Sequence, residues 1–332
     1  PRRDSDHWCD ELSSTPRGGV HTSGGWVVMR RRAKSRSTIL RWRSYSPEIQ
    51  GMVWMFLSTF AFTSMVGFVR EASATFNTFE ITFWRALFGL LFMVPWLVRV
   101  RLSGLKTKCV GMHLTRNVLH FIGIVTWVYV VAWINLSVGI ALQFTVPLFT
   151  IAMAALILKE RVDRARWTAT IIGFAGVLVI IRPDAGAIDA LAVITLVSAA
   201  FYAASNIATM AIGQDDSSEL VVFYMHLMHM PMALIGAFAM GMSVPNWTDL
   251  PTLAGVGISA TFAHYLLAQA LRVTDASVVM PIDFLKLPWI ALLAYTFYGE
   301  VPAAGAWDGR TIIYGATYYI LRREARAGRA RP

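Results

Sequence analysis

From residue 51 onward, the chain is a series of long apolar segments separated by short polar links. Most segments reach the roughly 20 apolar residues that an α-helix needs to cross the hydrocarbon core of a bilayer. So many consecutive segments could not all be buried in one water-soluble core. The pattern therefore predicts an all-α integral membrane protein with ten transmembrane helices, near residues 51–69, 81–98, 114–134, 138–158, 165–181, 190–212, 220–242, 253–271, 276–298 and 303–321.

The excess of positive charge lies in the two ends of the chain. Residues 1–47 carry a net charge of +6 and residues 322–332 a net charge of +4, which together account for the total of +10. Nucleic-acid-binding proteins gather basic residues on one folded face, so nucleic acid is not an expected partner. Residues 1–47 lack an apolar period and are predicted to form a disordered basic tail. The first methionine is Met29, which leaves open whether residues 1–28 belong to the natural protein.

The polar links differ in their content of lysine and arginine. With the N-terminus in the cytoplasm, the segments on the cytoplasmic side hold 24 of these residues and those on the other side hold 3. Cytoplasmic loops of membrane proteins are enriched in lysine and arginine. We therefore expect a multi-pass protein of the bacterial inner (plasma) membrane with both termini in the cytoplasm, including a basic cytoplasmic tail at 322–332.

Two stretches of the sequence, one in each half of the chain, are alike. The first runs Ser137-Val138, Leu158-Lys159-Glu160-Arg161-Val162 and Trp167, and the second Ser277-Val278, Tyr298-Gly299-Glu300-Val301-Pro302 and Trp307. The offset between them equals five segments, and an odd number of spans inverts the second copy in the membrane. Inverted repeats are typical of secondary transporters. We predict two inverted five-helix repeats, 48–182 and 183–321, although a chance match is the alternative.

Four stretches carry a resemblance to a known family: Ala141 to Arg161, Ala268-Gln269-Ala270-Leu271-Arg272 running on to Pro281-Ile282-Asp283-Phe284, Phe297 to Pro302, and Tyr319 to Glu324. Over about residues 50–324 the sequence resembles the EamA-type branch of the drug/metabolite transporter superfamily. The resemblance implies ten helices in two EamA-like repeats, cytoplasmic termini and movement of small organic solutes such as amino-acid derivatives, vitamins, nucleosides or drugs. It specifies the fold better than the substrate.

Ionisable residues inside a membrane span are costly and are candidates for function. Asp283 and Lys286 stand three residues apart in the ninth segment and would share a helix face. They either bind or gate the solute, or form a structural ion pair. Arg85 in the second segment either extends to the membrane surface or faces a central cavity, where it would pair with a solute carboxylate or with Glu80.

Three prolines predict interruptions in two helices. Pro281 and Pro288 lie in the ninth segment and Pro147 in the fourth, where it would free the carbonyl of Gln143 from its helical hydrogen bond. The fourth and ninth segments are counterparts in the repeat. Interrupted helices in corresponding places of two halves indicate a substrate site, although membrane helices also tolerate proline as a simple kink.

The remaining candidate substrate-binding residues lie on the third, fourth and eighth segments: His120, Trp127, Gln143, His264 and Gln269. Histidine titrates near neutral pH and could relay a coupling proton, and the tryptophan could stack on a ring-bearing solute. The alternatives are hydrogen-bonded structural histidines and a tryptophan that anchors the helix end at the membrane interface.

The candidate functions fall into different classes. The segment Met225–Met232, with His226 and His229, suggests a copper transporter as one alternative, because thioethers suit Cu(I). A membrane-embedded enzyme is another, but the chain lacks the H-E-x-x-H, G-x-S-x-G and P-loop patterns. We predict a secondary transporter that moves a small organic metabolite by alternating access, with no cofactor and no resident metal. The expected partners are the solute, a coupling proton and the lipid bilayer, with a homodimer left open.

Overall fold

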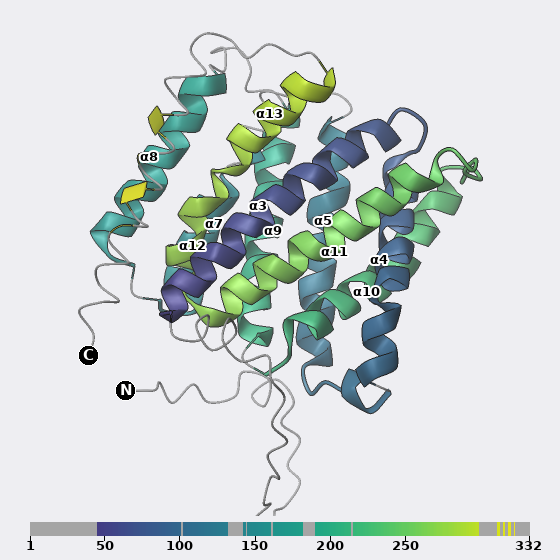
Figure 1. Cartoon of the computed structure of the whole chain (residues 1–332), viewed down its shortest axis with the longest axis horizontal. Helices are drawn as coiled ribbons and strands as arrows, with labels where there is room; N and C mark the ends of the chain where they lie inside the picture. The colour runs from purple at the N-terminus through teal and green to yellow at the C-terminus, as the bar shows by residue number, and fades with distance from the viewer. Residues whose placement is uncertain are drawn as a thin grey trace, which may run out of the picture.

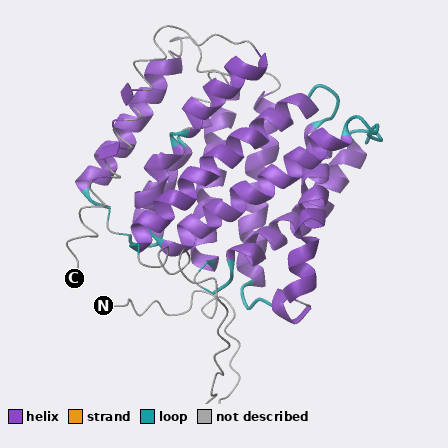
Figure 2. Cartoon of the chain, in the orientation of Figure 1, coloured by secondary structure: helices purple, strands orange, loops and turns teal. Residues whose placement is uncertain are grey.

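The computed structural model describes residues 45–100, 102–131, 142–143, 145–160, 162–181, 190–213 and 215–298, with residues 311, 312, 315, 318, 319 and 322. Every regular element in these parts of the chain is a helix (Figure 2). The elements are α3 (Pro47–Ala72), α4 (Thr78–Val100), η1 (Leu102–Leu105), α5 (Val110–Val131), α7 (Val146–Ile157), α8 (Arg164–Ile181), α9 (Ala190–Ile212), α10 (Ser218–Ala239), α11 (Leu250–Val273), α12 (Ala276–Asp283) and α13 (Lys286–Tyr298). Most of the two predicted tails and most of the segment 303–321 lie outside the described residues.

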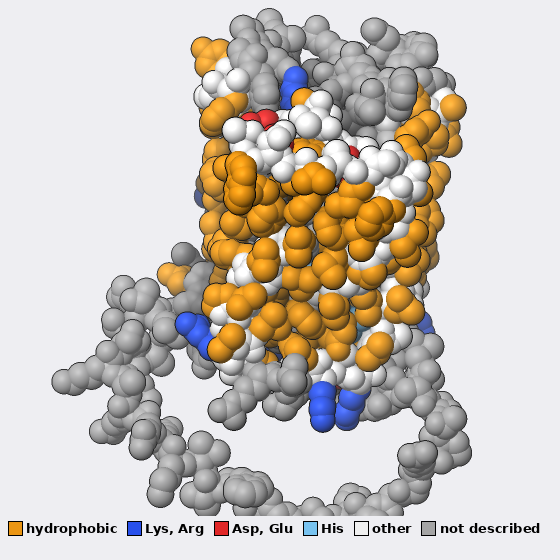
Figure 3. Space-filling model, turned by 90° about the vertical axis from the view of Figure 1, so that its right-hand side faces the viewer, with side chains coloured by type: hydrophobic (Ala, Val, Ile, Leu, Met, Phe, Trp, Pro, Cys, Tyr) orange, Lys and Arg blue, Asp and Glu red, His pale blue; other side chains and the backbone are white. Residues whose placement is uncertain are grey.

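The described helices have the length and composition of membrane spans. Six stretches are long and apolar enough to cross a bilayer: Pro47–Ala72, Thr78–Val100, Val193–Ile212, Ser218–Ala239, Leu250–Val273 and Ala276–Phe297. Apolar side chains cover the middle of the visible face, and lysines and arginines gather mainly at its lower edge (Figure 3). The prediction of an all-helical protein is thus confirmed for the described residues, and these six stretches support its multi-pass membrane character. The number of ten spans stays a prediction.

The helices pack in pairs that join the two halves of the chain. α3 lies against α11 along much of its length, and α5 lies against α9 in the same way (Figure 1). α4 contacts both α10 and α11, whereas α8 lies at the edge of the bundle against α7 and α12. The approach of α11 to α4 depends on Gly257, because a Cβ atom there would lie 2.9 Å from the nitrogen of Gly89 and 3.0 Å from the carbonyl oxygen of Arg85.

The ninth predicted segment is divided into two helices. α12 ends at Asp283 and α13 begins at Lys286, with Phe284 and Leu285 between them. α7 begins at Val146, which is the counterpart of Lys286 when Glu160 is aligned with Glu300. Pro147 lies in the first turn of α7, where the missing N–H removes no helical hydrogen bond. This proline therefore starts a helix, rather than kinking a continuous one.

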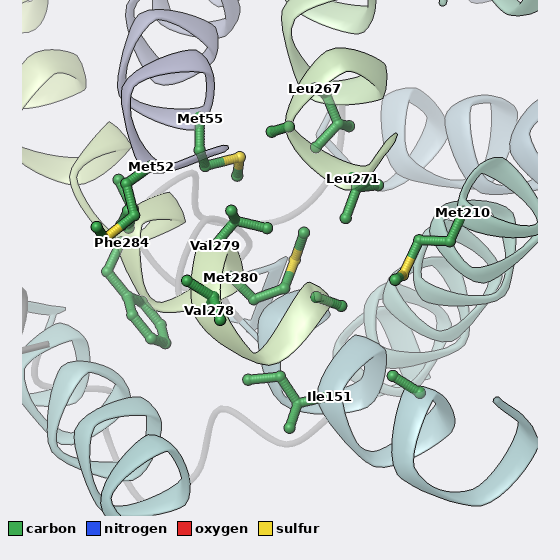
Figure 4. Packing of buried hydrophobic residues seen from close by; sticks show 14 of the residues in the cluster. Met52, Met55, Ile151, Met210, Leu267, Leu271, Val278, Val279, Met280 and Phe284 are labelled. Atoms are coloured by element: carbon green, nitrogen blue, oxygen red, sulfur yellow. The ribbon is translucent and has the colours of Figure 1, made fainter. Parts of the chain in front are cut away.

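The short helix α12 is buried along its whole length. Its central residues Val278, Val279 and Met280 are surrounded by apolar side chains of four other helices (Figure 4). These are Met52 and Met55 of α3, Leu267 and Leu271 of α11, Ile151 of α7 and Met210 of α9. This packing fixes the position of the break between α12 and α13 inside the bundle.

A carboxylate from the first half of the chain holds the N-terminus of α12. Glu160 accepts hydrogen bonds from the backbone nitrogens of Ala276 at 3.2 Å and Ser277 at 3.0 Å, and from the Ser277 hydroxyl. The first N–H groups of a helix have no partner within the helix, and negative charge is favourable there. Glu160 thus connects the end of α7 to the helix that carries Asp283.

Candidate functional site

Two arginines and four histidines come together near the middle of the bundle. The group comprises Arg85 of α4, Arg116 and His120 of α5, His226 and His229 of α10, and His264 of α11, and we call it the arginine–histidine cluster. Each of these side chains is at most 4% exposed. His120, His229 and His264 lie close to the midpoints of their helices. Both halves of the chain contribute to the cluster.

Arg85 is held by a histidine of the other half. Its Nη2 atom donates to Nδ1 of His229 at 2.9 Å, and Nε2 of His229 donates to the carbonyl oxygen of Asn117 at 3.2 Å. These partners assign His229 as a neutral imidazole with its hydrogen on Nε2. Arg85 thus points into the bundle instead of extending to the membrane surface.

Glu80 does not pair with Arg85, which was the other partner considered from the sequence. The Glu80 carboxylate accepts hydrogen bonds from the backbone nitrogen of Asn77 at 2.7 Å and from the backbone nitrogen and hydroxyl of Ser243 at 2.5 and 2.6 Å. This carboxylate therefore caps the start of α4 and connects it to the loop after α10.

Arg116 is fixed by neutral groups. Its Nε atom donates to the hydroxyl of Thr209 at 3.2 Å, and its Nη1 atom donates to the side-chain oxygen of Asn117 at 2.7 Å. The amide nitrogen of Asn117 in turn lies 3.2 Å from the sulfur of Met228. Neither Arg85 nor Arg116 forms an ion pair with a carboxylate of a described residue.

His120 and His264 form a direct contact between the two halves. Their Nε2 atoms are 2.8 Å apart, and Nδ1 of His264 lies 3.0 Å from the carbonyl oxygen of Ala260. Because Nδ1 of His264 must donate to that carbonyl, its Nε2 accepts and His120 donates. A single proton therefore lies between the two rings. His120 also stacks on His229 with ring centroids 5.1 Å apart and meets the edge of Tyr202 at 5.3 Å.

His226 occupies a space left by a glycine. Its Nε2 atom lies 3.0 Å from the hydroxyl of Thr261, which donates to the carbonyl oxygen of Gly257 at 2.7 Å, so His226 is the donor. A Cβ atom on Gly89 would lie within 2.4–2.7 Å of the imidazole ring. Gly89 and Gly257 together let α4, α10 and α11 meet at this point.

Asp283 and Lys286 form the predicted pair, but across the helix break. The Lys286 ammonium lies 2.5 Å from Oδ1 of Asp283, between the last residue of α12 and the first of α13. The same ammonium lies 4.2 Å from the ring centroid of Phe62, whose ring is 5.0 Å from that of His264. The phenylalanine thus lies between the pair and the arginine–histidine cluster.

The other predicted site residues are less closely connected to the cluster. The amide nitrogen of Gln143 donates to Ser198 of α9 at 3.1 Å, and that of Gln269 donates to the hydroxyl of Tyr265 at 3.0 Å. Trp127 is partly buried and lies further along α5 than His120. Pro281 lies within α12 and Pro288 in the first turn of α13.

The two histidines of the copper alternative are bonded to other groups. His229 is bonded to Arg85 and Asn117, and His226 to Thr261. The part of the chain that the structure describes has no group of three or more histidine, cysteine or acidic side chains that could hold a metal ion.

Sequence reasoning missed Arg116, His226 and His229 as parts of one site. A signal was present, because Arg116 and His120 are four residues apart on one helix and His226 and His229 three apart on another, so each pair shares a face. What the sequence does not give is the packing of α10 against α4 and α5, which brings the two faces together.

Comparison with known proteins shows which family this chain resembles. A sequence model of the EamA-like transporter family matches the chain twice, over residues 49–182 and 190–322. A riboflavin transporter of Rhizobium johnstonii is 33% identical over 287 residues, covering 86% of this chain and 95% of that protein. An S-adenosylmethionine uptake transporter of Rickettsia prowazekii is 26% identical over 281 residues, covering 84% and 95%.

One solved structure has the same overall fold. It superposes with a TM-score of 0.69 at 14% sequence identity, over 83% of this chain and 98% of that one. The named relatives are transporters, and no enzyme activity accompanies their names. The two family matches, one on each half, show that this chain is a member of the EamA-like transporter family.

Proposed function

We propose that this protein is a secondary transporter that moves a small organic metabolite across the bacterial inner membrane by alternating access. The observation that carries the proposal is the arginine–histidine cluster. Ionisable groups are expensive in a membrane interior and mark substrate pathways when they occur there. Here six of them are buried together, near the middle of an apolar bundle, and come from helices of both halves.

The walls of the cluster suit a ring-bearing solute. The rings of His120 and His229 are stacked. Around the histidines lie three aromatic rings: Tyr202 is 5.3 Å from His120, Phe121 is 5.6 Å from His229 and Phe62 is 5.0 Å from His264, measured between centroids. Aromatic rings favour offset or edge contacts at such distances. Relatives named for riboflavin and for S-adenosylmethionine point to solutes with a heteroaromatic ring system, and we extend that class to this chain.

Alternating access would use the two interrupted helices. α7 begins at Val146 and α13 at Lys286, which are equivalent places in the two proposed repeats, 48–182 and 183–321. Gln143 and Asp283 are equivalent in the same way, and each precedes one of the two breaks. In transporters, breaks of this kind lie beside the substrate and provide the hinge between pseudo-symmetric halves. We include Asp283 and Lys286 in the proposed site as its edge at the second break.

The proposed orientation has the loops rich in lysine and arginine in the cytoplasm. Lys106 and Lys108 lie beside Asp216, and Lys159 lies beside Ser277, as the bonds from Thr107 to Asp216 and from Ser277 to Glu160 show. Arg272, which donates to the carbonyl oxygen of Gly213, puts these two groups of loops at the same end. Arg70 lies at the opposite end, in the last turn of α3. Fusion of a periplasm-active reporter to the C-terminus should give no signal, and an active reporter would contradict this orientation.

A coupling proton has a candidate carrier in the His120–His264 contact. The pair holds one proton between its Nε2 atoms, and a second proton there would make His264 an imidazolium whose N–H faces the N–H of His120, beside the charged Arg85 and Arg116. Separation of α5 from α11 would accommodate that proton. A pH gradient imposed on proteoliposomes should therefore accelerate uptake, and His264→Gln should abolish this acceleration.

The direct test of the transport proposal is flux with purified protein. Proteoliposomes containing the full chain should accumulate at least one compound from a panel of riboflavin, S-adenosylmethionine and metabolites whose pools change when the gene is deleted. Protein-free liposomes are the control. The proposal is wrong if no panel compound enters faster than in the control.

A further inference from the structure

The arginine–histidine cluster carries positive charge that the described protein does not balance. Arg85 and Arg116 are 1% and 3% exposed, and each is bonded only to neutral groups. The hydrogen-bond partners of His229, His264 and His226 all fit neutral imidazoles. The two guanidinium groups thus leave two positive charges in the middle of the bundle. A buried charge without a counter-charge is costly. Two such charges in one place therefore indicate that a ligand supplies the counter-charge.

Arg85 also has unused hydrogen-bond donors. Its Nε and Nη1 atoms are buried and have no hydrogen-bond partner among the described residues, and only Nη2 is engaged, with His229. A guanidinium presents its N–H groups in a planar fork that matches the two oxygens of a carboxylate or the oxygens of a phosphate. The Nε and Nη1 donors therefore lack the kind of partner for which the geometry of the group is suited.

We propose that the transported solute carries an anionic group, a carboxylate or a phosphate, which binds the free Nε and Nη1 donors of Arg85 while Arg116 supplies a second positive charge. This inference rests on the proposed transport function and narrows its substrate class. A bound carboxylate neutralises one of the two positive charges of Arg85 and Arg116, and a bound phosphate neutralises up to two. The loaded site is then close to neutral, so enclosing it in the bundle costs less than enclosing the unloaded site.

The test compares matched pairs of compounds that differ in one anionic group. Riboflavin is paired with riboflavin 5′-phosphate, and S-adenosylmethionine with its decarboxylated form. Binding is measured from the thermal unfolding midpoint of the purified full chain in detergent, at constant ionic strength. The variants are Arg85→Gln, Arg116→Gln and, as a control, Arg99→Gln, which removes the same charge from an exposed position on the same helix as Arg85.

The anionic member of at least one pair should stabilise the wild type and Arg99→Gln, with an apparent affinity at least tenfold above that of its partner. Arg85→Gln and Arg116→Gln should lose this preference, and their unfolding midpoints without ligand should be no lower than that of the wild type. A preference within the riboflavin pair indicates a phosphate, and a preference within the S-adenosylmethionine pair indicates a carboxylate. Absence of a charge preference in both pairs, or its survival in both glutamine variants, overturns the proposal.

A lysine variant keeps the test decisive if a glutamine variant fails to fold. Arg85→Lys retains the charge but lacks the planar fork, so it should keep the preference for the anionic compound with reduced affinity. The flux assay distinguishes failure of the anion proposal from failure of the transport proposal. If Arg85→Gln transports the anionic compound as fast as the wild type does, transport stands and the anion proposal falls. If no compound is transported, the transport proposal itself fails.

Discussion

Two charged regions of this protein lie close to each other, and they differ in whether the buried charge has a counter-charge within the described protein. At the helix break, Asp283 and Lys286 neutralise each other at 2.5 Å, and the lysine side chain keeps 21% exposure. In the arginine–histidine cluster, Arg85 and Arg116 are almost fully buried and bonded only to neutral groups. The first region is complete without a solute, whereas the second gains a counter-charge only from outside the described chain.

The difference predicts opposite responses to the loss of charge. Removing one member of a neutral buried pair leaves an isolated charge, which is strongly destabilising. Removing a charge that had no counter-charge relieves a desolvation cost, so the unliganded fold should be at least as stable as the wild type. Charge removal thus distinguishes a group that maintains the structure from one kept for its ligand.

The largest effect is expected at the helix break. Asp283→Asn or Lys286→Met alone should destabilise the protein by about 3 kcal/mol, at the lower end of the range for broken buried pairs because Lys286 is partly exposed. The double variant should recover most of this loss, since no isolated charge remains. Equilibrium unfolding in mixed micelles measures the three values.

Transport by the double variant tests whether the pair also belongs to the site. Because Phe62 lies between Lys286 and His264, we expect the folded double variant to transport at least tenfold more slowly than the wild type. Normal transport by a well-folded double variant would leave the pair as a structural element and remove it from the site.

A smaller effect is expected where α4 and α11 meet. Gly257→Ala places a Cβ atom within 3.0 Å of backbone atoms of α4, which cannot move aside as a flexible side chain does. We expect a loss of about 1–3 kcal/mol, as for other overpacked interiors. Solute binding should weaken as well, because Arg85 and Thr261 lie at this crossing, while the Asp283–Lys286 pair is left intact.

Gly111→Ala is the matched control for this substitution. Gly111 lies near the start of α5, and a Cβ atom there has no neighbour within 4 Å. The stability and the transport rate of Gly111→Ala should stay at the wild-type level. Equal losses in the two variants would mean that the close approach of α4 and α11 does not position the cluster.

The sequence predicted the membrane fold well, because apolar segments long enough to cross a bilayer have few alternatives to a spanning helix. It also identified Arg85, His120 and His264 individually, since each is a polar residue in an apolar segment. It did not predict that these side chains meet, because the crossing of α4, α10 and α11 depends on the backbone contact at Gly257 and the ring space at Gly89. Small residues of this kind are common in membrane helices, so their spacing alone does not single out one crossing.

The helix break shows the same limit. Pro147 and Pro281 indicated interruptions, but the structure puts Pro147 in the first turn of a new helix and leaves α12 to end two residues after Pro281. The position of the second break instead depends on the burial of α12 among side chains of several other helices. Tertiary packing of this kind is not encoded in any local pattern of the sequence.

The smallest effect is expected at Glu160, which holds α12 from its N-terminal end. Glu160→Gln keeps one oxygen acceptor for the N–H groups of Ala276 and Ser277 but loses the negative charge that is favourable at a helix start. We expect a loss of stability of about 1 kcal/mol, the usual value for one hydrogen bond.

Because α12 carries Asp283 and none of the cluster, the affinity for an anionic solute should change less than twofold in Glu160→Gln. Glu71→Gln, at an exposed carboxylate of α3, is the control and should change neither property. A large loss of solute affinity in Glu160→Gln without a loss of stability would show that the two charged regions are coupled through α12, and that the cluster is not the independent binding element inferred here.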